Sequence, residues 1–250
     1  MSVEVRTVTG LSELAAVDRL FGAIWRQDPG SPVLSTELLR ALVKSGNYVA
    51  AAYDGAALLG ACVGFFGVPG ARELHSHIAG VAPEAVGRSV GYALKQHQRS
   101  WALERGATAI SWTFDPLVAR NAYFNLAKLG AAPVEYLPNF YGAMHDRING
   151  DDESDRLLVR WDLSRPATPL RDDTSGAVVA LGRDGVPGNL DGGKLLVAVP
   201  PDVETLRRRD PGEARRWRPA VRDALSTLLA AGARVTGFDR AGWYVLRRPS

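Results

Sequence analysis

Residues that build disulfide frameworks and metal clusters are scarce in this sequence. Its 250 residues include one cysteine, Cys62, and four histidines. One cysteine cannot form an internal disulfide or a thiolate metal cluster. We therefore expect no bound metal and a reducing, cytoplasmic compartment.

Long apolar runs and the best-known nucleotide-binding loops are missing as well. The strongly apolar run that ends at Phe66 is too short to span a bilayer, and residues 1–9 include charged side chains. We therefore expect no membrane segment and no export signal. The sequence has neither a Gly-x-x-x-x-Gly-Lys-Ser/Thr motif nor a Gly-x-Gly-x-x-Gly motif, which argues against a kinase or a dehydrogenase.

The overall composition is that of a folded protein. Hydrophobic residues make up 46% of the chain and charged residues 23%, which excludes a disordered chain, a collagen and a coiled coil. Residues 1–165 carry 16 basic and 17 acidic groups, whereas residues 166–250 carry 14 and 10. Acidic residues interleave with the C-terminal arginines, so we interpret that segment as a solvated helical face and do not expect it to bind nucleic acid.

The spacing of apolar residues predicts strands and helices in the order β-α-α-β-β-β-α-β-α-β-β up to residue 163. Asp54-Gly55 is typical of a hairpin turn, and Gly106 is expected to end a helix that begins at Gly87. A second helix is expected from Asn121 to Leu129. Paired strands followed by strand-helix-strand predict an α+β (mixed α/β) fold, with a central mixed sheet and helices on both faces.

Residues 164–175 have the composition of a linker. We therefore predict a first domain over residues 1–165 and a small C-terminal β-α-β extension over residues 176–250, with a helix from Glu213 to Ala231. An extension of about 75 residues is near the lower limit for folding alone. We expect it to pack on the first domain or on a partner subunit, as in a homodimer.

Residues 81–94 (VAPEAVGRSVGYAL) combine several features of an anion-binding turn. A strand stops, the chain turns, and a helix begins across Gly87 and Gly91. The first turn of a helix has N–H groups without internal partners and carries positive potential, a geometry that fits a pyrophosphate. Arg88 and Ser89 could donate further hydrogen bonds. The alternative is a close-packed helix start with no ligand.

This turn and a second motif resemble those of a known family. The second motif is a strand at residues 112–114, then Asn121, then a helix that closes with Lys-Leu-Gly at residues 128–130. Together they resemble the GNAT superfamily of acyl-CoA-dependent N-acyltransferases, and residues 3–163 are similar to its domain. The resemblance covers about two thirds of the chain, and it extends in particular to a bacterial subgroup of predicted acetyltransferases that has a long C-terminal extension.

The resemblance implies a mostly antiparallel sheet and acetyl-CoA, or another acyl-CoA, as co-substrate, with no metal. The pantetheine would lie along the strand that ends at Val81, and a backbone N–H near Ile78, Ala79 or Gly80 would stabilise the negative charge that develops on the thioester carbonyl. The residues that the resemblance assigns to the co-substrate are Ala79, Gly80, Val81, Val86, Gly87, Arg88, Ser89, Val90, Gly91, Asn121 and Phe124. For Asn121 a helix N-cap is the alternative.

Three residues depart from the family pattern. Members usually have Arg or Gln at the position of Val86 and Gly at the position of Ser89. Many have a tyrosine general acid at the position of Leu126; here Tyr123 or Tyr141 could replace it. Without that acid the leaving thiolate lacks its usual proton donor, although a thiolate is a fair leaving group.

Three polar side chains on one strand are the candidates for catalysis. Glu73, His75 and His77 alternate along residues 73–81, so they are expected to share one face. An amine must lose a proton before it attacks a thioester, and a histidine has the best unperturbed pKa for a general base. The alternative is that some of them lie at a sheet edge or are hydrogen-bonded in the core.

The leading hypothesis is therefore an N-acyltransferase that moves an acetyl or other short acyl group from acyl-CoA to a primary amine of a small molecule, for example an amino acid. Arg72 or Arg120 near the acyl end would favour an acidic group, as in an N-succinyltransferase. One alternative is a catalytically silent CoA-binding or small-molecule-sensing protein. Another is an interaction role for the basic C-terminal segment.

Overall fold

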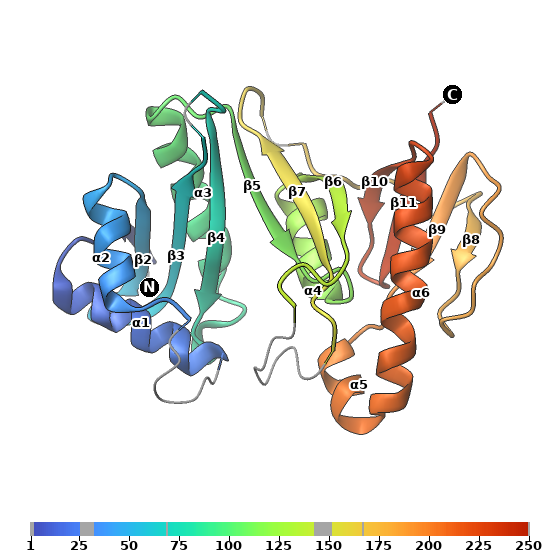
Figure 1. Ribbon diagram of the computed structural model, residues 1–250, viewed down its shortest axis with the longest axis horizontal. Helices are drawn as coiled ribbons and strands as arrows, with labels where there is room; N and C mark the ends of the chain where they lie inside the picture. Colours follow the sequence, from blue (N-terminus) through green and yellow to red (C-terminus); the bar gives the residue numbers. More distant parts are fainter. Residues whose placement is uncertain (1–2, 26–32, 69, 143–151, 167, 250) are drawn as a thin grey trace. The chain divides into compact units, whose positions relative to one another are not determined.

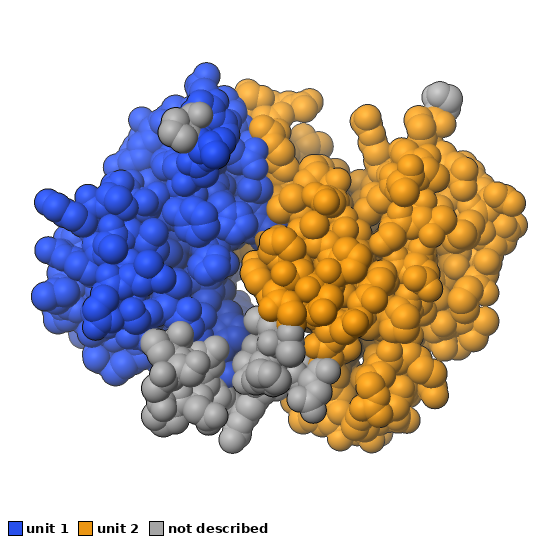
Figure 2. Space-filling model, in the orientation of Figure 1, with its two compact units in different colours: residues 1–112 blue, residues 113–250 orange. Residues whose placement is uncertain are grey.

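The computed structural model describes residues 3–25, 33–68, 70–142, 152–166 and 168–249. Its contacts divide the chain into two compact units, residues 1–112 and 113–250 (Figure 2). In the described part of the chain, no helix is both long enough and apolar enough to cross a membrane. The domains predicted over residues 1–165 and 176–250 stay a prediction.

The first unit is built on strands in the spatial order β1-β2-β3-β4-β5, of which only the pair β4 and β5 is parallel (Figure 1). Its elements are β1 (Glu4–Thr7), α1 (Leu11–Trp25), α2 (Thr36–Lys44), β2 (Tyr48–Asp54), β3 (Ala57–Phe66), β4 (Glu73–Val81), the 3₁₀ helix η1 (Pro83–Ala85), α3 (Val90–Glu104) and β5 (Ala109–Phe114), whose last two residues belong to the second unit.

Helices cover both faces of β2 and β3, which explains why these strands are apolar on both sides. Residues of α1 and α2 form one core with alternate residues of the two strands, including Val49 and Val63. On the other face α3 packs so closely that a Cβ on Gly60 would lie 3.0 Å from a methyl of Val90 and 3.2 Å from one of Leu94. Glycine is therefore needed at position 60 for this helix to approach the sheet.

The second unit holds a β6–β7 antiparallel pair and a four-stranded sheet in the order β10-β11-β9-β8. Helix α6 contacts β6 as well as β8 and β9, so it joins the pair to this sheet. The elements are α4 (Ala119–Ala122), the π-helix η2 (Tyr123–Lys128), β6 (Ala132–Leu137), β7 (Arg156–Asp162), β8 (Val178–Leu181), β9 (Lys194–Ala198), α5 (Val203–Arg209), α6 (Pro211–Ala230), β10 (Arg234–Phe238) and β11 (Trp243–Arg247).

The mixed α/β class with a mostly antiparallel sheet is confirmed, and three details differ from the sequence prediction. Helix α3 begins at Val90, three residues later than predicted, because Gly87 and Ser89 have positive φ angles of 88° and 59°. The helix predicted from Asn121 is one α-helical turn followed by a π-helix, a form that often accompanies functional sites. Helix α5 was not predicted.

Candidate functional site

Strand β4 brings His75 and His77 together beside Phe65. The two imidazole centroids lie 6.1 Å apart, and they are 5.2 and 5.7 Å from the Phe65 ring. A β-bulge contributes to this arrangement: Val63 pairs with Ile78 but the next residue of β3 pairs with residue 76, so His77 is an additional residue of β4. Bulges next to binding sites commonly re-aim a side chain in this way.

Both imidazoles have a lowered pKa. Burial is the main cause for each, and for His75 the nearby His77 and Lys95 lower the pKa further while Glu73 raises it. The neutral form of each ring is therefore favoured at neutral pH, and a neutral imidazole has a nitrogen lone pair that can accept a proton. Glu73 is half-buried at the start of the same strand.

A buried lysine lies behind the strand, on the side opposite these imidazoles. Lys95 of α3 donates hydrogen bonds to Ser76 Oγ (2.7 Å) and Gln98 Oε1 (3.3 Å), and its Nζ lies 3.9 Å from the ring centroid of Trp112. Burial lowers its pKa to about 8. Cys62 Sγ lies 3.8 Å from the same Ser76 hydroxyl, and burial raises the pKa of this thiol, which makes it a poor nucleophile.

Lys95 was missed by the sequence analysis. Its spacing from Gln98 and Ala102 is that of the buried stripe of α3, and all three side chains are buried. This spacing was the available signal, because a lysine on an apolar helical stripe must either reach solvent or be held by polar partners inside.

The turn between β4 and α3 leaves several backbone N–H groups without a partner. Those of Gly87, Ser89, Val90 and Gly91 form no hydrogen bond to any other described residue, whereas Arg88 N donates to a carbonyl at position 85. Val86 N likewise donates within the turn, to Pro83 O, and the Val86 side chain is 72% exposed. Of the six residues 86–91 that the resemblance assigns to the co-substrate, four therefore have a backbone N–H that is available to a ligand.

The guanidinium predicted to reach the phosphates has a carboxylate partner. Arg88 Nη2 donates to Oδ2 of Asp54, the last residue of β2, over 2.6 Å. Ser89 is the N-cap of α3 but its hydroxyl caps no N–H, and its φ of 59° is one that glycine adopts without strain. The structure thus gives the physical reason why glycine suits position 89.

The end of β4 has one strand partner only. Its parallel pairing with β5 covers residues 73–75, and residues 76–81 pair with β3 alone within the described part of the chain. Gly80 is buried there, and a Cβ on it would lie 2.6 Å from Ile24 Cδ1 of α1. Backbone groups on the second edge of residues 76–81 are therefore not used by a neighbouring strand.

The second unit contains the two remaining predicted residues. Asn121 is exposed and lies inside α4, and its N–H donates to Val118 O. The N-cap of α4 is Val118, so the N-cap alternative for Asn121 is wrong. Phe124 is half-buried. Leu126, at the position of the family's tyrosine, is completely buried, so this position does not present a polar group to a ligand.

A buried ion network in the same unit was also missed. Asp115 accepts hydrogen bonds from Arg218 Nη1 and Nη2 (3.1 and 2.9 Å) and from Arg207 Nη2 (3.1 Å), and both arginines also bond Asp152. Asp115 additionally caps the turn by accepting from Leu117 N, and its arginine partners hold its pKa low against burial. The network joins the end of β5 to α5 and α6.

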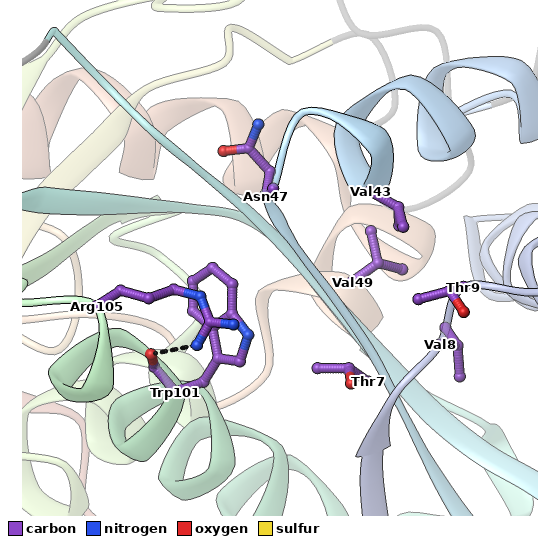
Figure 3. A pocket seen from close by; sticks show the side chains of 9 residues that line it. Thr7, Val8, Thr9, Val43, Asn47, Val49, Trp101 and Arg105 are labelled. Atoms are coloured by element: carbon purple, nitrogen blue, oxygen red, sulfur yellow. Dashed lines mark hydrogen bonds between the residues drawn. The ribbon is translucent and has the colours of Figure 1, made fainter.

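A separate cavity of about 160 Å³ lies in the first unit (Figure 3). It is lined by Thr7, Val8, Thr9, Val43, Gly46, Asn47, Val49, Trp101 and Arg105. No lining residue belongs to β4 or to the turn at residues 82–89, so this cavity is not the predicted acyl-CoA site. The guanidinium of Arg105 covers the Trp101 ring at 3.9 Å, which occupies the aromatic face (Figure 3).

Among the described residues, no three His, Cys, Asp or Glu side chains are grouped so that they could hold a metal ion.

Comparison with known proteins identifies the fold. No protein-family model and no curated protein matches the sequence. Solved structures do match. An N-acetyltransferase from Staphylococcus aureus is 13% identical with a TM-score of 0.55, over 66% of this chain and 100% of that one. The protein yncA from Salmonella typhimurium, solved with its cofactor acetyl-CoA, is 15% identical with a TM-score of 0.54, over 68% and 98%.

A third match carries the family name. A GNAT-family protein from Desulfovibrio desulfuricans is 13% identical with a TM-score of 0.51, over 65% of this chain and 100% of that one. At these identities the matches define the fold: about two thirds of the chain has the fold of the GNAT acetyltransferases, as the two sequence motifs predicted.

Proposed function

We propose that the protein is an N-acyltransferase that moves an acetyl or other short acyl group from acyl-CoA to a primary amine of a small molecule. One juxtaposition carries the proposal. The unpartnered N–H groups at the start of α3 follow directly on β4, and β4 also carries the two neutral imidazoles. One continuous segment, residues 75–91, would thus bind the diphosphate of the co-substrate and accept a proton from the amine.

In this proposal the amides of Gly87, Ser89, Val90 and Gly91 hold the CoA diphosphate at the positive end of α3. The unpaired edge of residues 76–81 holds the pantetheine by backbone hydrogen bonds. These groups position the thioester, and the backbone N–H of residue 78, 79 or 80 would stabilise the oxyanion.

His75 or His77 then accepts a proton from the substrate ammonium, which leaves a neutral amine. The amine nitrogen forms a bond to the thioester carbon and gives up its excess proton to water, while the C–S bond breaks and its electron pair stays on sulfur. The CoA thiolate is released and takes a proton from the imidazolium or from water. General-base catalysis of this kind contributes about 10²- to 10⁴-fold to the rate.

The basic residues considered for an acidic acyl group are already engaged. Arg72 Nε donates to Gly106 O over 2.8 Å, and Arg120 forms two hydrogen bonds with Glu204, of 3.1 and 2.6 Å. Neither guanidinium is therefore left without a partner, as it would need to be to pair with the free carboxylate of a succinyl group. This favours acetyl-CoA over succinyl-CoA as the donor.

Replacing each imidazole tests the proposal. In His75→Gln or His77→Gln, or in both, kcat for acetyl transfer to the accepted amine should fall by about 10²-fold or more, while the Kd for CoA stays within about twofold because the diphosphate contacts are unchanged. His97→Gln is the matched control, because His97 is hydrogen-bonded to Tyr48 and lies outside β4. Full activity in the double variant would exclude the histidines as the base.

The buried Leu126 supports a second candidate, a CoA-binding protein that does not turn over. The family's acid is replaced there by an apolar side chain that cannot reach a ligand. A thiol-release assay with acetyl-CoA and a panel of amines separates the two candidates. Release of CoA with any amine favours the enzyme, and tight CoA binding without release favours the silent protein.

A further inference from the structure

Tyr123, at the start of the π-helix, is surrounded by three cations from three separate segments. Arg240 Nε donates to the phenolic oxygen over 3.2 Å, and the guanidinium carbon lies 5.2 Å from the ring centroid. Lys128 Nζ lies 5.9 Å from the same centroid. Arg171 Nε donates to Ala127 O over 3.3 Å, which holds it on the same helix. We call Tyr123, Lys128, Arg171 and Arg240 the Tyr123 cluster.

The three cations have no acidic partner among the described residues. The acidic residues next to them in sequence are engaged elsewhere. Asp172 accepts from Arg247 and pairs with Lys194, and Asp239 accepts from Trp243 N. Three like charges on exposed side chains therefore lie around one phenol with no counter-charge from the described residues, so the local potential is positive and attracts an anion.

The phenol is suited to complete such a site. Arg240 occupies an acceptor position of its oxygen, so the O–H proton remains available to donate. The hydrogen bond from Arg240, together with Arg171 and Lys128, lowers the pKa of Tyr123. A more acidic phenol is a stronger hydrogen-bond donor to an anionic oxygen.

We propose that the Tyr123 cluster binds the phosphate group of a small-molecule ligand. Two guanidinium groups, one ammonium and one hydroxyl supply more donors than a carboxylate can accept, and they match the three terminal oxygens and the nearly double charge of a phosphate monoester. Because Arg171 and Arg240 lie C-terminal to residue 165, the site exists only when the C-terminal segment is packed on η2. This gives that segment a ligand-binding role that is independent of acyl transfer.

A titration with inorganic phosphate at constant ionic strength tests the site, and the NMR signals of the Tyr123 ring protons report the binding. Arg240→Gln and Lys128→Gln should each weaken phosphate binding by about fivefold or more, because each removes one charged donor, and Tyr123→Phe should weaken it less. Arg208→Gln is the matched control. Arg208 is an exposed arginine of the same unit, hydrogen-bonded to Thr205 Oγ1, and its loss should leave phosphate binding unchanged.

Two outcomes would overturn the proposal. One is that Arg240→Gln and Lys128→Gln bind phosphate as tightly as the unmodified protein, and the other is that phosphate does not shift the Tyr123 signals. A second arm identifies the source of the phosphate. If bound phosphate is displaced by CoA but not by CoA lacking its 3′-phosphate, the site serves the CoA monoester; if it persists with CoA bound, the site serves a separate phosphorylated molecule. No amine or turnover is involved, so failure of the acyltransferase proposal would leave this test valid.

Discussion

Replacing Lys95 by methionine should change how stability depends on pH. In the folded protein burial lowers the pKa of this lysine from 10.5 to about 8, and no carboxylate of the described residues pairs with it. Between these two values the unfolded chain binds one more proton than the folded chain at this position. Stability should therefore be highest above pH 10.5 and should fall as the pH drops toward 8, by about 1.4 kcal/mol per pH unit.

The full effect is about 3 kcal/mol, and below pH 8 it is constant because Lys95 is charged in both states. Methionine fills a similar volume without a charge, so Lys95→Met should be more stable than the unmodified protein at pH 7, by about 1–3 kcal/mol once the lost hydrogen bonds and the contact with Trp112 are subtracted. The two proteins should converge as the pH approaches 10.5.

Urea unfolding at pH 7, 8, 9 and 10 measures this difference. Lys44→Met, at an exposed lysine of α2, is the control and should follow the unmodified protein at every pH. Burial raises the pKa of the Cys62 thiol and Lys95 lowers it, so both proteins are compared in a Cys62→Ala background, in which this thiol cannot titrate. Parallel curves for Lys95→Met and the unmodified protein would refute the reasoning, because they would show that Lys95 keeps an ordinary pKa when folded.

Three further substitutions follow from the geometry. Ser89→Gly should raise stability by about 0.5–1 kcal/mol and should not weaken CoA binding, since glycine adopts the 59° φ without strain; a loss of stability in urea would contradict this. Arg218→Met should lower the free energy of unfolding by about 3 kcal/mol, because it removes a buried partner of Asp115. If calorimetry finds the melting temperature unchanged, the pair is not buried. Gly60→Ala should cost about 1–3 kcal/mol, because its Cβ would lie 2.8 Å from Gly80 O of β4 and 3.0 Å from a Val90 methyl of α3. A circular-dichroism melt equal to that of the unmodified protein would rule out this close packing around Gly60.

Local signals in the sequence were sufficient for much of the fold. Periodicity placed the strands of the first unit, and Asp54-Gly55 marked the hairpin in which Asp54 and Ala57 pair. The start of α3 could not be read from periodicity, because Val86 and Val90 have the four-residue spacing of a helical face while positive φ angles at Gly87 and Ser89 prevent a helix between them. A short π-helix has no simple spacing of its own, so η2 was predicted as an ordinary helix.

The site was accessible to sequence reasoning only where residues are close in the chain. His75 and His77 lie two apart on one strand, so their proximity followed from alternation, although the bulge at His77 did not. The pairing of Arg88 with Asp54 joins positions 34 residues apart, and that of Asp115 with Arg218 joins positions 103 apart. Such pairs depend on tertiary packing, which cannot be read from residue spacing along a single sequence.

Hydrogen exchange of the backbone amides with and without CoA tests the central claim most directly. CoA should slow exchange at Gly87, Ser89, Val90 and Gly91, whose N–H groups have no partner among the described residues, and calorimetry under the same conditions should detect binding. Unchanged exchange at these four amides, with no heat of binding at millimolar CoA, would contradict it.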